Sequence, residues 1–133
     1  MTTFRPRAYV KTTCPYSFKF RLFITEAGLA DQIDFVPMDP DASDFKGIKA
    51  DVEARSGAPL HFPTVEVDRD LFINDSDRLI AHFSKLHGIN ASSLATLNFY
   101  RHGLFPTFLE LFALCASPLA WLIRLGKRPR AFK

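Results

Sequence analysis

The stretch Lys11-Thr12-Thr13-Cys14-Pro15-Tyr16-Ser17 decides how the rest of the sequence is interpreted. Residues 8–10 precede it as a short β-branched and aromatic run, which is typical of a strand. Residues 18–29 follow it with apolar side chains at helical spacing. We therefore expect Cys14 where a strand gives way to a helix, with Pro15 in the first helical turn, where its missing N–H group costs nothing. The free N–H groups and the helix dipole favour a thiolate there, so Cys14 is a candidate nucleophile.

Length and charge limit the class of protein. A chain of 133 residues, 47% of them hydrophobic, fits one domain with a real core. Residues 1–100 hold 11 Lys/Arg and 13 Asp/Glu, whereas residues 101–133 hold 6 Lys/Arg and one acid. The basic character therefore belongs to the C-terminal segment, which argues against a nucleic-acid-binding face on the main body.

The cysteine content indicates a reducing compartment. Cys14 and Cys115 are the two cysteines and lie far apart in the sequence, so a disulfide framework is not expected. Residues 1–7 are short and polar and do not resemble a secretory signal. The expected location is the cytoplasm.

The periodicity of the remaining chain predicts an ordered series of elements. Strands are expected at residues 7–11, 33–36, 64–67 and 71–73, and helices at residues 15–27, 44–56 and 74–87. A strand–helix–strand unit suggests parallel pairing, and the later hairpin suggests antiparallel pairing, so we expect an α/β fold with a four-stranded mixed sheet. Phe18, Leu22 and Phe23 are expected on the inward face of the first helix.

Two short motifs resemble known families. Lys11-Thr12-Thr13-Cys14-Pro15-Tyr16 resembles the active-site segment of glutaredoxins. Cys14-Pro15-Tyr16-Ser17, followed by Lys19 and Arg21, resembles the N-terminal domain of cysteine-type glutathione transferases. Both families have the thioredoxin fold, with the element order β-α-β-α-β-β-α that the pattern predicts. The resemblance implies a thioredoxin-like, glutathione-binding domain at residues 1–88 and glutathione as its cofactor.

A proline at the entry to a strand is the second feature of the resemblance. Pro63 is out of place there unless it has a special role, although a trans proline at a strand start is an ordinary alternative. The resemblance implies that Pro63 is cis and faces the thiol. Phe62 would then offer its backbone N–H and C=O groups to the cysteine of glutathione.

The pair Asp75-Ser76 is the third feature. Read locally, it caps a helix, because short polar side chains accept the free N–H groups of the first turn. The resemblance implies that Asp75 holds the ammonium of the γ-glutamyl group and that Ser76 holds its carboxylate. Pro15 and Tyr16 would flank the ligand beside the thiol. Lys11 would pair with the glycine carboxylate, with a solvated strand-end lysine as the alternative.

The nature of residue 17 decides the expected chemistry. Ser17 stands where dithiol glutaredoxins have their second cysteine, so a monothiol cycle is expected, in which Cys14 takes glutathione from glutathionylated thiols. The alternatives are a non-catalytic glutathione-binding or protein-interaction module, or a carrier of an iron–sulfur cluster with glutathione as co-ligand.

Because 46 residues follow residue 87, the helical second domain that completes a glutathione transferase is not expected within this chain. The four histidines show no metal-ligand spacing, so no metal site is predicted.

Residues 89–133 form an expected helical extension with a basic tail. A short helix is predicted at residues 92–100, and the strongly apolar run 104–125 contains two prolines that suggest helices at 106–116 and 118–125. Cys115 within this run is expected to be buried. The run is predicted to pack on the domain or across a dimer, to lie in a membrane interface with its basic tail on anionic headgroups, or to span a membrane.

Overall fold

The computed structural model describes residues 3–116 of the 133. The elements before the extension are β1 (Arg7–Val10), α1 (Pro15–Glu26), a 3-10 turn (Ala30–Gln32), β2 (Asp34–Pro37), α2 (Phe45–Ser56), β3 (Thr64–Asp68), β4 (Leu71–Asn74) and α3 (Ser76–His87). A 3-10 turn (Ala91–Ser93), α4 (Ala95–Phe99), a π-helical segment (Tyr100–Leu104) and α5 (Phe105–Ala116) follow. The predicted order β-α-β-α-β-β-α is confirmed.

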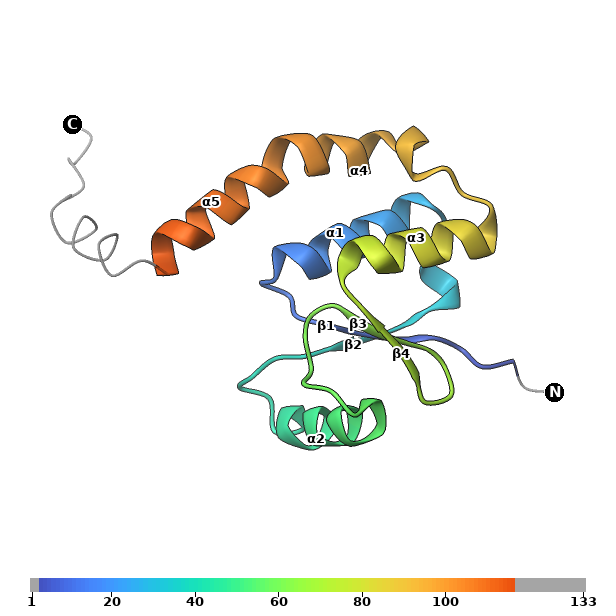
Figure 1. Ribbon diagram of the computed structural model, residues 1–133, viewed down its shortest axis with the longest axis vertical. Coiled ribbons are helices and arrows are strands. Elements are labelled where there is room, and N and C mark those ends of the chain that lie inside the picture. The colour runs from blue at the N-terminus through green and yellow to red at the C-terminus, as the bar shows by residue number, and fades with distance from the viewer. Residues whose placement is uncertain (1–2, 117–133) are drawn as a thin grey trace, which may run out of the picture.

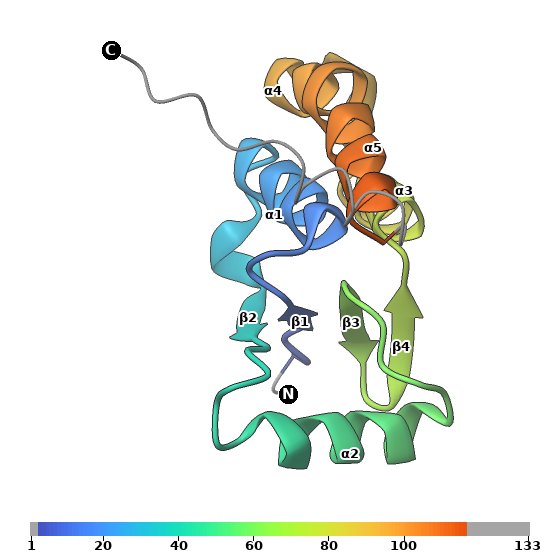
Figure 2. The same cartoon turned by 90° about the vertical axis from the view of Figure 1, so that its left-hand side faces the viewer.

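The four strands form one mixed sheet in the order β2-β1-β3-β4. β1 pairs with β2 in parallel and with β3 antiparallel, and β3 and β4 form the predicted hairpin. Helices α1 and α3 cover one face of the sheet and α2 covers the other, which gives three layers (Figures 1 and 2). This is the thioredoxin-like fold.

The larger core lies between the sheet and the layer of α1, α3 and α4. Phe20, Phe23 and Ile24 of α1 are fully buried in it, together with Val65 of β3 and Leu79 of α3. The prediction for Phe23 is confirmed, but the prediction for Phe18 is wrong, because its side chain is 51% exposed. Phe18 lies two residues from Phe20, which places the two side chains on different sides of a helix with 3.6 residues per turn.

The extension after α3 packs on α1. Glu26, at the end of α1, accepts hydrogen bonds from the N–H groups of Thr96 (2.9 Å) and Leu97 (2.8 Å) at the start of α4. The hydrogen bond from Thr96, together with that from Leu97, holds the pKa of Glu26 below its ordinary value despite some desolvation. Leu97 is fully buried against the core. The carboxylate therefore caps one helix while it anchors that helix to another.

α5 continues from the π-helical segment and leads away from the body of the domain (Figure 1). It confirms the helix predicted at residues 106–116, whereas the helix predicted at residues 118–125 lies outside the described residues. The expectation that Cys115 is buried is wrong, because α5 leaves the body before this residue and the thiol is exposed. Within residues 3–116, no helix combines the length and the apolar character that crossing a membrane requires.

Candidate functional site

Cys14 lies at the junction between β1 and α1, as the sequence predicts. It is the residue that precedes the first turn of α1, with an extended backbone (φ −92°, ψ 121°) and Pro15 immediately after it. Its N–H group donates to the carbonyl of Lys11 (3.1 Å), and its carbonyl accepts from the N–H group of Phe18 (2.9 Å). The side chain is partly exposed. The thiol is thus held at the end of a helix where free N–H groups favour negative charge.

The segment before β3 approaches this thiol. The peptide bond between Phe62 and Pro63 is cis, which confirms the expectation for Pro63. The carbonyl oxygen of Phe62 lies 3.7 Å from Sγ of Cys14 and accepts a hydrogen bond from the thiol. Two segments that are 48 residues apart in the sequence therefore meet at the sulfur.

Ser17 has a structural position and does not face the ligand side. Its side chain is fully buried, and Oγ accepts a hydrogen bond from the N–H group of Lys11 (3.2 Å). The hydroxyl thereby joins the end of β1 to the first turn of α1. Because residue 17 is a serine, the first turn of α1 contains no second thiol beside Cys14.

Asp75 and Ser76 begin α3 on the other side of the cis peptide. Oδ1 of Asp75 accepts hydrogen bonds from the N–H groups of Asp77 (2.8 Å) and Arg78 (3.2 Å), and Oδ2 takes part in neither bond. The backbone of Asp75 has φ +76°, a left-handed value that non-glycine residues rarely adopt and that costs about 1–3 kcal/mol. Local capping is therefore confirmed, and one carboxylate oxygen remains outside the cap.

Two adjoining cavities bring the predicted site residues together. The first, of about 530 Å³, is lined by Tyr16, His61, Phe62, Asn74, Asp75, Ser76 and Arg78. The second, of about 420 Å³, is lined by Lys11, Thr13, Cys14, Pro15, Tyr16, Phe62, Leu109 and Phe112. Tyr16 and Phe62 line both cavities. Pro63 is fully buried and lines neither cavity.

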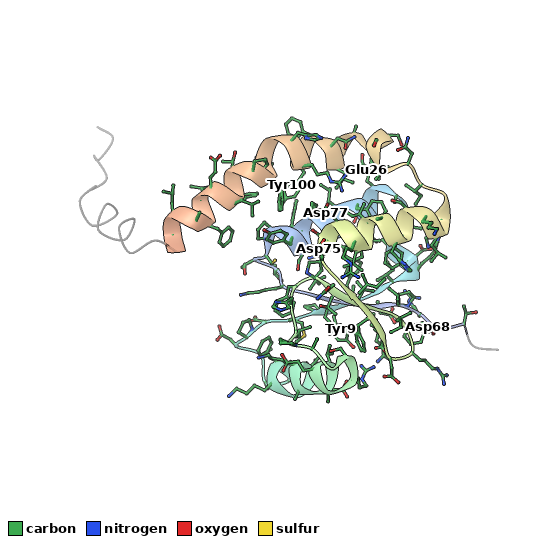
Figure 3. All side chains as sticks on the ribbon, viewed as in Figure 1. Tyr9, Glu26, Asp68, Asp75, Asp77 and Tyr100 are labelled. Carbon is green, nitrogen blue, oxygen red and sulfur yellow. The ribbon has the colours of Figure 1, made fainter. Side chains whose placement is uncertain are left out.

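The extension contributes residues that the sequence did not connect with Cys14. A third cavity, of about 350 Å³, is lined by Cys14 and Phe18 together with four residues of the extension, which are Tyr100, Leu104, Phe108 and Phe112. The hydroxyl of Tyr100 donates a hydrogen bond to the carbonyl of Pro15 (2.8 Å), and Figure 3 shows this tyrosine between the extension and α1. Burial raises the pKa of Tyr100, and the neighbouring charge of Cys14 adds to the rise. The extension thus forms an apolar wall beside the thiol.

An ion network fixes the extension to the core near Cys14. Nζ of Lys19 lies 3.1 Å from both carboxylate oxygens of Asp77, although the Lys19 side chain is only 3% exposed. The same ammonium lies 4.3 Å from the ring centroid of Phe105, and Arg101 donates to Asp77 (3.0 Å). Desolvation acts to raise the pKa of Asp77, but the hydrogen bonds and charges of Lys19 and Arg101 outweigh it and hold the pKa below its ordinary value. The sequence pattern includes Lys19 in the motif that begins at Cys14, but it does not predict that Lys19 pairs with Asp77.

Within residues 3–116, no group of three or more His, Cys, Asp or Glu side chains is placed to hold a metal ion.

Comparisons with known proteins indicate the family of the chain. The family model for the glutathione S-transferase N-terminal domain matches residues 13–86, which is more than half of the chain. Oxidized glutaredoxin 2 from Chlamydomonas reinhardtii is 19% identical with a TM-score of 0.47, covering 70% of this chain and 78% of that one. A possible glutathione S-transferase from Rhodopseudomonas palustris is 17% identical with a TM-score of 0.53, covering 89% of this chain and 63% of that one. No curated protein matches the sequence.

Proposed function

Because the chain belongs to the glutathione S-transferase N-terminal domain family, we propose that it binds glutathione and acts as a monothiol thiol–disulfide oxidoreductase through Cys14. The observation that supports this most strongly is the meeting of Sγ of Cys14 with the carbonyl of Phe62, 3.7 Å apart, where two cavities adjoin. A cysteine-containing peptide in extended form can lie along this backbone beside the thiol, because Phe62 offers main-chain hydrogen-bonding groups as an edge strand does.

The polar groups at the two ends of the adjoining cavities suit the two ends of glutathione. Oδ2 of Asp75 takes the ammonium of the γ-glutamyl group, and the N-terminus of α3 with Ser76 takes its carboxylate. Lys11 lies in the cavity with Cys14 and takes the glycine carboxylate. Pro15 and Tyr16 flank the ligand between these ends.

The reaction needs one protein thiol and two glutathione molecules in succession. The Cys14 thiolate attacks the glutathione sulfur of a mixed disulfide. An S–S bond forms between Cys14 and glutathione, the original S–S bond breaks, and the substrate leaves as a thiolate that takes a proton from water. The thiolate of a second glutathione then attacks the glutathione sulfur held by Cys14. Glutathione disulfide leaves, and the Cys14 thiolate is regenerated.

Trapping the covalent intermediate tests this proposal. The reduced protein is mixed with a glutathionylated small thiol in the absence of free glutathione, and its peptides are analysed by mass spectrometry. One glutathionyl group is expected on the peptide that contains Cys14, with release of one equivalent of the small thiol, and addition of free glutathione is expected to remove it.

The exposed Cys115 serves as an internal reference in the same experiment. Equal labelling of Cys14 and Cys115 would mean non-specific exchange and would contradict the proposal. Saturable binding of glutathione without any adduct on Cys14 would favour the non-catalytic binding module.

Substitution of Asp75 separates capping from ligand binding. Asp75→Asn keeps an oxygen for the N–H groups of Asp77 and Arg78 but removes the charge, so the Kd for glutathione is expected to rise about tenfold with little change in stability. Asp75→Ala loses the cap as well, at a cost of about 1 kcal/mol. Calorimetric titration and urea unfolding measure the two effects.

Asp68 offers a matched control at the far end of the β3–β4 hairpin (Figure 3). Its Oδ1 also accepts a hydrogen bond from a backbone N–H group, that of Arg69 (2.7 Å). Asp68→Asn is expected to leave the Kd unchanged. An unchanged Kd in Asp75→Asn would mean that this carboxylate is a helix cap only.

A further inference from the structure

The C-terminal half of α5 exposes large apolar side chains to solvent, which is unfavourable for an isolated domain. Leu111, Phe112 and Leu114 are 51%, 52% and 58% exposed, even though the beginning of the helix packs on Tyr16 and Tyr100. Glu110 is the only charged residue in α5. A helix that is apolar on nearly every side is normally buried in a core or in lipid. This surface therefore requires a partner.

The sequence that follows α5 indicates the chemistry of that partner. Residues 117–125 continue the apolar run and contain Trp121, the single tryptophan of the chain. Residues 126–133 then hold four Lys/Arg and no acid. An apolar segment that ends in a basic cluster complements a surface whose headgroups are anionic and whose interior is hydrocarbon.

We propose that α5 attaches the domain to an anionic lipid surface and lies in its interface, with electrostatic attraction added by the basic residues that follow it in the sequence. A second copy of the chain complements this segment less well. Residues 101–133 contain 6 Lys/Arg and only Glu110 as an acid, so two copies cannot neutralise each other in either orientation. An interfacial position also leaves Glu110 and the basic side chains at the headgroups, where they stay hydrated.

Attachment through α5 would determine where the thiol lies. Leu109 and Phe112 of α5 line the cavity that contains Cys14. A lipid-bound α5 therefore holds Cys14 close to the membrane surface. This inference goes beyond the proposed oxidoreductase function and does not depend on it, since lipid binding is measured without glutathione.

Vesicle binding by the full chain tests the apolar part of the proposal. We expect co-sedimentation with phosphatidylcholine vesicles that contain phosphatidylserine, and a blue shift of Trp121 fluorescence with quenching by brominated lipid.

The double variant L111Q/L114Q is expected to bind about tenfold more weakly, because two apolar side chains no longer enter the hydrocarbon. Neither residue lines a cavity at Cys14. The matched control L71Q/L86Q alters side chains that are 55% and 64% exposed elsewhere and is expected to bind as the unaltered chain does.

Charge variants test the electrostatic part. Two triple variants are compared, K127Q/R128Q/R130Q in the tail and K46Q/R69Q/K85Q on exposed positions of the main body. The tail variant is expected to bind at least about tenfold more weakly to the phosphatidylserine vesicles, since three basic side chains no longer attract the anionic headgroups. Binding is also expected to weaken as salt is added. The main-body variant is expected to bind normally.

Three results would overturn the proposal. The first is absence of binding to the phosphatidylcholine vesicles that contain phosphatidylserine. The second is equal weakening by L111Q/L114Q and by its control, with circular dichroism showing that both remain folded. The third is a stable dimer in sedimentation velocity that L111Q/L114Q dissociates, because the apolar face would then be occupied by a second copy.

Discussion

Cys14→Ser is expected to reduce glutathione-dependent reduction of a small glutathionylated disulfide to the uncatalysed rate, a loss of at least about 10³-fold. A serine hydroxyl at the start of α1 is far less acidic and less nucleophilic than a thiol in the same place. The hydroxyl of Ser17, one helical turn further on, is fully buried and accepts a hydrogen bond from the backbone of Lys11, so it does not replace the thiol. Release of glutathione disulfide, coupled to its enzymatic reduction, measures the rate.

Cys115→Ser is the matched control, because it removes the other cysteine of the chain while leaving the cavities untouched. It is expected to retain the full rate. A Cys14→Ser protein that keeps a substantial part of the rate, or a Cys115→Ser protein that loses it, would place the reaction at a different thiol. Calorimetric titration with glutathione shows whether Cys14→Ser retains the binding site.

The second large effect is expected at the ion pair that joins α1, α3 and the extension. Asp77→Ala removes the carboxylate that lies 3.1 Å from the ammonium of Lys19, whose side chain is only 3% exposed. Arg101, which donates to the same carboxylate, loses this partner as well. Removing the partner of a fully buried charge costs about 3–5 kcal/mol. Because Asp77 itself is 65% exposed, we expect a smaller loss, about 2 kcal/mol.

The reverse substitution is expected to be much milder. Lys19→Met removes the buried charge and replaces it with an apolar chain of similar length, while Asp77 keeps Arg101 (3.0 Å) and its access to water. The double variant Lys19→Met/Asp77→Ala is expected to recover most of the stability lost in Asp77→Ala. Urea unfolding of the unaltered chain, the two single variants and the double variant measures the free energy of unfolding for each protein in this cycle. Equal losses of stability in the two single variants would contradict the idea that the buried charge of Lys19 causes the effect.

Local chemistry explains why much of the fold was predictable from sequence. Pro15 marks the start of a helix, Gly57 ends another, and Asp68 is the last residue of a strand before the turn to the next, so each of these elements carries its own boundary. The placement of Cys14 and the cis bond before Pro63 followed from the same local features together with the resemblance.

The contributions of the extension were not predictable, because they depend on how it packs. α1 has apolar residues on more than one side, and the spacing alone does not reveal that Phe18 faces Tyr100, with their ring centroids 5.0 Å apart, rather than the core. Nor does it reveal that Lys19 pairs with Asp77, 58 residues later. The exposure of Cys115 likewise follows from the direction in which α5 leaves the body.

The π-helical segment determines which side of α5 meets the thiol. There the N–H group of Phe105 donates to the carbonyl of Tyr100, five residues earlier, instead of four as in an α-helix. Such a widened turn shifts the angular phase of all later residues by about 100°, the angle that one α-helical residue occupies. With uninterrupted α-helical winding, Phe108 and Phe112 would point in another direction, and a different set of side chains would meet Cys14. The side chains of α5 that line the cavities at Cys14 are thus set by the number of residues in a single turn, so that a one-residue insertion or deletion there would bring other side chains of α5 to the thiol without changing the sequence of that helix.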